Sequence, residues 1–141
     1  MKQKILIVED SPPSMRLIEM TLRPKGYELL KATDGEEALN IAIREKPALI
    51  IMDIYLPKVN GLEVTKGLRQ MPAFNHIPII AVTAHAMKGD KEKIIEAGCD
   101  AYLPKPINTH QLPRVVAEML RQWQKDSVSH PRKWQRARKS L

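Results

Sequence analysis

Short apolar segments alternate with longer amphipathic segments along this chain. The apolar segments cover residues 4–9, 27–33, 48–53, 77–83 and 101–104, and their length and composition are typical of β-strands. Residues 13–23, 35–45, 61–71, 87–98 and 111–124 instead carry apolar side chains at helical spacing. This alternation predicts an α/β fold, with a parallel sheet covered by helices on both faces. The near-continuous apolar runs ILIV and LIIM are typical of strands buried on both sides.

Prolines refine the expected ends of two helices. Ser11 is placed to cap the first helix, with Pro12 or Pro13 in its first turn. Pro113 would disrupt a last helix that began at Asn108 or Thr109, because its ring would meet the carbonyl four residues back. We therefore expect the last helix to start late or irregularly.

The basic charge of the chain is concentrated near its C-terminus. Of the 141 residues, 23 are Lys or Arg and 16 are Asp or Glu, a net charge of +7. Residues 125–141 hold six of the basic side chains and one acid. We expect one domain over residues 1–124, followed by a basic tail over 125–141. The tail is too short for a folded output module, and three uses stay open: a solvated segment, a protein-docking segment, or contact with nucleic acid or anionic lipid.

Cysteine and histidine usage argues against a secreted framework or a zinc site. Cys99 is the single cysteine and cannot form an internal disulfide, and the four histidines lie far apart. The apolar run at the N-terminus is too short for a signal peptide or a membrane span. A cytoplasmic location without membrane insertion is therefore expected.

Polar residues stand at the ends of four of the five predicted strands. Glu9 and Asp10 follow the first, Asp53 ends the third, Thr83 ends the fourth, and Lys105 follows the fifth. In open α/β sheets, ligands bind in the crevice beyond the carboxyl ends of the strands. We therefore expect these five side chains to converge on one site.

The chemistry of such a site follows from its charges. Three carboxylates held about 4 Å apart repel by several kcal/mol per pair, so they need a cation or a proton. Mg²⁺ suits a few carboxylates completed by water and phosphate oxygens. Asp53 is then placed to attack phosphorus, while Lys105 balances charge on the phosphoryl oxygens and Thr83 donates a hydrogen bond to one of them.

Four ordered motifs match a known family: VEDS with its acid pair, MDIYLPKVNG around Asp53, VTAHA with Thr83, and AYLPKPIN with Lys105. The sequence resembles the receiver domain of bacterial two-component response regulators, in a stand-alone form similar to chemotaxis regulators. The resemblance implies a flavodoxin-like five-stranded parallel sheet of order 2-1-3-4-5 with five helices. It also implies phosphorylation of Asp53, Mg²⁺ bound by Glu9, Asp10, Asp53 and the backbone carbonyl of Tyr55, and phosphoryl contacts from Lys105 and Thr83.

The resemblance further implies partners and a switch. The donor would be a phosphohistidine of a sensor histidine kinase or a histidine phosphotransfer protein, and the domain would be a phosphoacceptor rather than a conventional enzyme. Thr83 would move toward the phosphoryl group and Tyr102 would turn inward, remodelling the surface of the fourth helix, fifth strand and fifth helix for a downstream protein. A cis Lys105–Pro106 bond is implied as well, and phosphorylation-dependent dimerisation stays open.

Other interpretations differ at named residues. A haloacid-dehalogenase-like phosphatase needs a second Asp where this chain has Tyr55. A flavodoxin-like electron carrier needs a phosphate-binding loop where this chain has Glu9 and Asp10. A pseudo-receiver that only docks to a partner, without phosphorylation, stays open as an alternative.

Overall fold

The sheet is parallel and five-stranded, as the apolar segments predicted. The protein is represented by a computed structural model that describes residues 2–84 and 90–126. The strand order is β2-β1-β3-β4-β5, so the predicted order 2-1-3-4-5 is confirmed. The strands are β1 (Lys4–Val8), β2 (Glu28–Ala32), β3 (Leu49–Asp53), β4 (Ile79–Thr83) and β5 (Ala101–Pro104).

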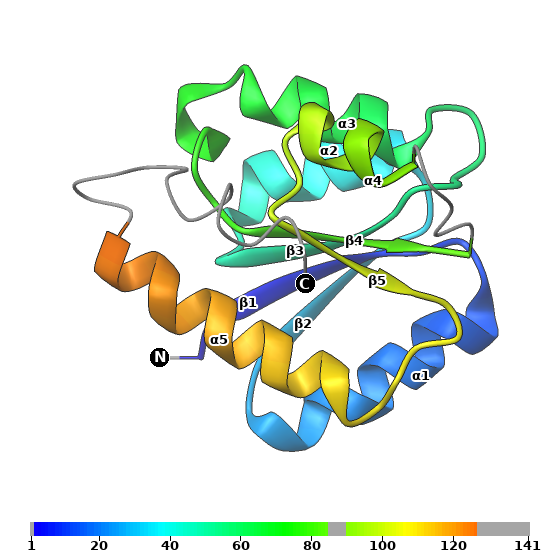
Figure 1. Cartoon of the computed structure of the whole chain (residues 1–141), viewed down its shortest axis with the longest axis vertical. Helices are drawn as coiled ribbons and strands as arrows, with labels where there is room; N and C mark the ends of the chain where they lie inside the picture. The colour runs from blue at the N-terminus through cyan, green and yellow to red at the C-terminus, as the bar shows by residue number, and fades with distance from the viewer. Residues whose placement is uncertain (1, 85–89, 127–141) are drawn as a thin grey trace.

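Within the described residues, five α-helices cover the two faces of the sheet, which agrees with the predicted number. They are α1 (Pro12–Leu22), α2 (Gly35–Glu45), α3 (Gly61–Arg69), α4 (Asp90–Ala97) and α5 (Gln111–Asp126), with 3₁₀ turns η1 (Arg23–Lys25) and η2 (Pro72–Phe74). Helices α1 and α5 lie on one face, and α2, α3 and α4 lie on the other (Figure 1). Within the described ranges, no helix combines the length and apolarity that crossing a membrane requires.

Alternate side chains of each central strand enter different cores. Ile5, Ile7 and Ile51 belong to the core on the α1 and α5 side. Leu6 and Ile50, their neighbours in sequence, belong to the core on the α2, α3 and α4 side. Because successive side chains of a strand point to opposite faces, a sheet covered twice needs apolar residues at every position. This explains the uninterrupted apolar runs in the sequence.

Helices α1 and α5 begin where the prolines predicted, but the side-chain cap expected for α1 is absent. Helix α5 begins at Gln111, so Pro113 lies in its first turn, where a missing amide donor costs nothing. The side chain of Asn108 caps this start by accepting hydrogen bonds from the amides of His110 and Gln111, both at 2.9 Å. Ser11 is the N-cap residue of α1, but its side chain makes no capping hydrogen bond. The amide of Ser11 instead donates to Glu9 Oε2 at 3.1 Å.

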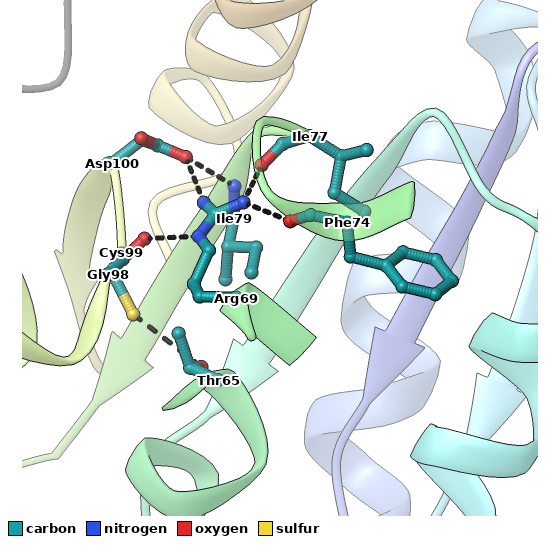
Figure 2. A network of polar contacts seen from close by, with 8 residues as sticks. All are labelled: Thr65, Arg69, Phe74, Ile77, Ile79, Gly98, Cys99 and Asp100. Carbon is teal, nitrogen blue, oxygen red and sulfur yellow. Dashed lines mark hydrogen bonds and ion pairs between the residues drawn. The ribbon is translucent and has the colours of Figure 1, made fainter. Parts of the chain in front are cut away.

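A buried polar network ties together the edge of the sheet where β4 and β5 begin (Figure 2). The Arg69 guanidinium pairs with Asp100 Oδ2 at 2.8 Å and donates to three backbone carbonyls, those of Gly98, Phe74 and Ile77. The same Asp100 oxygen accepts from the amide of Ile79 at 2.9 Å. The Arg69 network therefore joins the end of α3, η2 and the α4–β5 turn to the start of β4.

Candidate functional site

The predicted site residues lie at the carboxyl ends of the strands. Glu9 directly follows β1, Asp53 is the last residue of β3, Thr83 is the last residue of β4, and Lys105 directly follows β5. Because β1, β3, β4 and β5 are parallel neighbours in the sheet, their ends share one edge. The fold thus brings residues up to 96 positions apart into one site.

Three carboxylates form the centre of this site. Glu9, Asp10 and Asp53 each offer an oxygen, and these oxygens all lie within 4.8 Å of one another. Glu9 and Asp53 are buried, whereas Asp10 is exposed. We call these three residues the carboxylate cluster.

The ammonium group of Lys105 bridges the two buried carboxylates. Lys105 Nζ donates to Glu9 Oε2 at 3.2 Å and to Asp53 Oδ2 at 3.3 Å. Glu9 Oε1 lies 3.0 Å from the same nitrogen in an ion pair, but this oxygen accepts no hydrogen bond although it is buried. One cation therefore faces two buried anions, so the cluster keeps an excess of negative charge.

The environment of Asp53 favours its protonated form. Burial raises the pKa of Asp53 to about 7, the Glu9 carboxylate adds to the rise, and Lys105 opposes it. The amide of Tyr55 donates to Asp53 Oδ1 at 3.1 Å and also favours the charged form. The carboxylate is therefore held in place by a backbone donor and a lysine, yet it lacks full charge compensation.

Lys105 is held at both its backbone and its side chain. Its amide donates to the carbonyl of Thr83 at 2.8 Å, which fixes the start of the loop after β5 against the end of β4. The Lys105–Pro106 peptide bond is cis, as the resemblance implied. Burial lowers the pKa of Lys105, but the hydrogen bonds and charges of Glu9 and Asp53 outweigh burial and raise the pKa overall. Lys105 therefore stays a cation.

The two predicted switch residues occupy different environments. Thr83 is buried at the end of β4 and lines a pocket of about 180 Å³ beside the acceptor loop, by which we mean residues 54–60. Tyr102 lies opposite Ala81 in the β4–β5 ladder, partly exposed, and packs against the core on the α2, α3 and α4 side. The structure thus brings Thr83 to the site edge and places Tyr102 within β5.

Comparison with known proteins identifies the family to which this chain belongs. The model of the response regulator receiver domain family matches residues 5–117, most of the chain. The chain belongs to this family. The match begins within β1 and ends within α5 of the receiver.

Individual relatives agree with the family match. The receiver is 47% identical over 116 residues to the polar-differentiation response regulator DivK of Brucella anthropi, an alignment that covers 82% of this chain and 92% of that protein. Its structure resembles the chemotaxis response regulator CheY4 of Vibrio cholerae, with a TM-score of 0.80, 29% identity, and coverage of 84% and 99% of the two chains.

A third relative was solved with a metal ion. The receiver domain of the sensor histidine kinase PA1611 from Pseudomonas aeruginosa has a magnesium ion coordinated in its active site cleft. It shares 37% identity with this receiver at a TM-score of 0.79, over 85% of this chain and 98% of that one. Fold and family therefore agree with the interpretation drawn from the four motifs.

One residue that shapes the receiver site escaped the sequence analysis. Gly61 begins α3, and a Cβ placed on it would overlap the carbonyl oxygen of Asp53 and come within 2.9 Å of Ile54 Cα. The amide of Gly61 donates to the Ile54 carbonyl at 2.8 Å. The acceptor loop can fold back against the end of β3 only because this position has no side chain. The Asn60-Gly61 pair was the available signal, since Asn60 caps α3 by accepting from Glu63 N.

Proposed function

We propose that this receiver takes a phosphoryl group from a phosphohistidine onto Asp53 and passes the signal on through protein contact. The donor would be a sensor histidine kinase or a histidine phosphotransfer protein. The observation that carries this proposal is the arrangement of Asp53 between Lys105 and the buried Glu9 at the carboxyl edge of the sheet. A nucleophile, a fixed cation and an anionic cluster that can hold a divalent metal are components of a phosphoryl-transfer site.

The carboxylate cluster suits Mg²⁺, and we propose that Glu9, Asp10, Asp53 and the Tyr55 carbonyl hold it. Three carboxylate oxygens lie within 4.8 Å of one another, and a buried oxygen of Glu9 accepts no hydrogen bond. Oxygen donors of this kind are the ligands that Mg²⁺ prefers. When bound, Mg²⁺ would supply positive charge that keeps Asp53 ionised and offsets the charge of the phosphoryl oxygens.

The transfer step itself is a simple exchange of bonds. An oxygen of Asp53 forms a bond to phosphorus while the bond from phosphorus to the donor imidazole nitrogen breaks. The imidazole leaves with the electron pair of that bond and takes up a proton. Lys105, already within 3.3 Å of Asp53 Oδ2, is close enough to balance the charge on the transferred group.

The conformational response to phosphorylation would depend on Thr83 and Tyr102. Thr83 has a hydroxyl at the site edge and would donate a hydrogen bond to the phosphoryl group. Tyr102 lies one strand away, on the surface shared by α4, β5 and α5, and its inward rotation would change the shape that this surface offers to a downstream protein.

We further propose that the receiver spans residues 1–124 and that residues 125–141 are a separate basic tail, of which residues 127–141 lie outside the described part of the chain.

Incubation of the whole chain with acetyl phosphate and Mg²⁺, followed by intact mass measurement, tests the proposal. We expect one phosphoryl group on the wild type and none on Asp53→Asn. Lys105→Ala should still be phosphorylated, and its Mg²⁺ affinity should change little. Phosphorylation of this variant should, however, alter its contact with the downstream protein less than phosphorylation of the wild type does. Failure to label the wild type, or equal labelling of Asp53→Asn, would overturn the proposal.

A further inference from the structure

The turns that lead into β1, β2 and β3 carry exposed basic side chains. Lys2 precedes β1, Lys25 is the last residue of η1 ahead of β2, and Lys46 lies between α2 and β3. These three strands are parallel neighbours in the order β2-β1-β3, so their starts lie at one edge of the sheet. This amino edge is opposite to the edge that holds the carboxylate cluster.

Backbone hydrogen bonds hold these turns side by side. The amide of Glu28 donates to the carbonyl of Gln3 at 3.0 Å, and the amide of Ala48 donates to the carbonyl of Lys4 at 2.8 Å. The turn before β2 and the turn before β3 are therefore both tied to the segment that enters β1. The fold thus brings lysines from three separate parts of the sequence to neighbouring positions.

The C-terminal half of helix α5 extends the amino edge. Arg121, Gln3 and Tyr27 line a hollow of about 280 Å³, together with Ala117 and Leu120. Figure 1 shows the same arrangement, with the start of β1 beside the C-terminal half of α5. Burial raises the pKa of Tyr27, so its hydroxyl stays protonated near neutral pH and can donate. The Gln3 amide and the Arg121 guanidinium are donors as well, and three donors around one hollow suit a phosphate group.

Four exposed side chains form what we call the basic edge: Lys2, Lys25, Lys46 and Arg121. Among the described residues, none of these four takes part in an ion pair. Of the acids nearby, Glu45 already pairs with Lys4 at 3.0 Å and with Arg44 at 3.2 Å. Glu28 begins β2, and Glu118 lies one turn earlier in α5 than the hollow. Basic side chains therefore outnumber acids at the amino edge.

The charge of the basic edge is opposite to that of the carboxylate cluster. A strand rises about 3.3 Å per residue, so the five residues of β1 separate the two edges by about 15 Å. An anionic surface attracts the basic edge and repels Glu9, Asp10 and Asp53 at the other edge. We therefore expect the folded domain to meet such a surface in one orientation, with Asp53 directed away from it.

The segment after α5 adds positive charge at this edge and indicates the kind of surface. Helix α5 ends at Asp126, and residues 127–141 hold five basic side chains and no acid. Trp134 and Leu141 stand among these charges. Basic side chains combined with Trp and Leu are typical of segments that bind the interface of an anionic lipid bilayer. The two apolar side chains favour a bilayer over a DNA duplex.

We propose that the basic edge is a membrane-binding surface, which holds the receiver on an anionic lipid bilayer together with residues 127–141 and leaves the carboxylate cluster facing the solution. The phosphate of a lipid headgroup would occupy the hollow beside Arg121. The inference goes beyond the proposed function and does not depend on phosphorylation of Asp53. Because the basic edge holds few charges, we expect measurable binding to need both the edge and the tail.

Cosedimentation of the whole chain with lipid vesicles tests this surface. We expect binding to vesicles of phosphatidylcholine mixed with phosphatidylglycerol, weaker binding as salt rises, and no binding to phosphatidylcholine alone. Lys25→Gln combined with Lys46→Gln should weaken binding by about 10-fold to 30-fold, since each basic side chain near an anionic bilayer contributes about fivefold. Failure of the wild type to bind, or unchanged binding of this double variant, would overturn the inference.

Lys91→Gln combined with Lys93→Gln is the matched control. It removes the same charge from the first turn of α4, where Lys93 lines the pocket beside Thr83 at the carboxyl edge. Because salt screens charges at that distance from the bilayer, binding should stay within about twofold of the wild type. An equal loss in both double variants would show that net charge alone decides binding, and would refute a surface located at the basic edge.

Arg121 and Arg114 give a second comparison within α5. Both side chains are exposed, but Arg121 lines the hollow and Arg114 lies in the first turn of the helix. Arg121→Gln should weaken vesicle binding by about fivefold, and Arg114→Gln should change it little. Equal effects of the two substitutions would refute the part assigned to the hollow.

Two further measurements separate this inference from its alternatives. If the chain binds duplex DNA more tightly than the anionic vesicles at the same ionic strength, nucleic acid is the partner and the proposal is wrong. Asp53→Asn should bind the vesicles at least as tightly as the wild type, and a loss of binding would contradict the orientation. If the wild type takes no phosphoryl group from acetyl phosphate, the proposed function fails while vesicle binding still tests the basic edge.

Discussion

At the scale of single residues, the absence of a side chain at Gly61 is as important to the site as the carboxylate of Asp53. A methyl group at position 61 would overlap the Asp53 carbonyl, and the backbone of Ile54 leaves no room for relief. We expect Gly61→Ala to lower the free energy of unfolding by about 1–3 kcal/mol and to slow labelling of Asp53, because the acceptor loop must shift. Urea unfolding and acetyl phosphate labelling measure the two effects.

Gly67 provides a control within the same helix. A Cβ at Gly67 would meet no atom within 4 Å. Gly67→Ala should therefore raise the free energy of unfolding by up to about 1 kcal/mol, through the better helix propensity of alanine, and leave labelling unchanged. Similar losses in both variants would show that the close approach to Asp53 is not what constrains position 61.

The pKa of Asp53 predicts a pH dependence of stability. Burial raises this pKa from 3.8 to about 7, so the folded state binds the proton more tightly than the unfolded chain. The resulting stabilisation is complete below about pH 4 and is lost as the pH rises through about 7. In buffer containing a chelator, the free energy of unfolding of the wild type should fall across this window relative to Asp53→Asn, by at most about 4 kcal/mol.

Urea unfolding at several pH values measures this difference. Mg²⁺ added at about pH 8 should stabilise the wild type more than Asp53→Asn, because the variant lacks one of the proposed ligands. Parallel pH profiles for the two proteins would contradict the assigned environment of Asp53.

At the scale of secondary structure elements, local patterns predicted the strands and helices well. The apolar runs at 48–53 and 77–83 became β3 and β4, since strands covered on both faces leave an unambiguous signal. The late start of α5 followed from Pro113. The meeting of Glu9, Asp53 and Lys105 could be expected from sequence, because parallel strands bring their carboxyl ends to one edge.

Contacts between distant elements could not be predicted in this way. The Arg69–Asp100 pair spans 31 residues, and the hydrogen bond from the Tyr55 hydroxyl to Asp90 spans 35. Neither pair follows from helical or strand periodicity, because such contacts depend on where loops place their side chains. The Ser11 side chain, expected to cap α1, likewise makes no capping bond; the Ser11 amide instead donates to the buried Glu9.

The Arg69 network gives a prediction about how the elements are held together. Asp100→Ala would remove the carboxylate that pairs with the Arg69 guanidinium, whose side chain is only 9% exposed. We expect a loss of about 3–5 kcal/mol in the free energy of unfolding, with labelling of the folded protein retained, because the network lies at the opposite end of the strands from Asp53. Urea unfolding measures the loss.

Arg44 offers a comparison on the surface. Its ion pair with Glu45 has a length of 3.2 Å, and the Arg44 side chain is 66% exposed. Arg44→Met should therefore change the free energy of unfolding by less than about 1 kcal/mol. A comparable cost for Arg44→Met and Asp100→Ala would mean that burial is not what makes the Arg69 network important.

At the scale of the whole molecule, removing residues 127–141 tests the proposed division into a receiver and a basic tail. Among the described residues, the two cores that enclose the sheet extend no further than Leu120. Residues 127–141 carry five basic side chains and no acid, so their removal lowers the net charge from +7 to +2. We expect a chain ending at Asp126 to keep its free energy of unfolding and its labelling by acetyl phosphate, because neither the cores nor the carboxylate cluster loses a residue.

The same truncation distinguishes the three uses of the tail. If the tail binds nucleic acid or anionic lipid, the full chain should bind these polyanions in a salt-dependent manner and the truncated chain should not. If it docks on the donor, transfer from a phosphorylated kinase should slow while labelling by acetyl phosphate stays unchanged, because the small donor needs no docking surface. A solvated tail predicts no change in either measurement. Collapse of acetyl phosphate labelling would contradict all three, and would place the tail within the folded receiver.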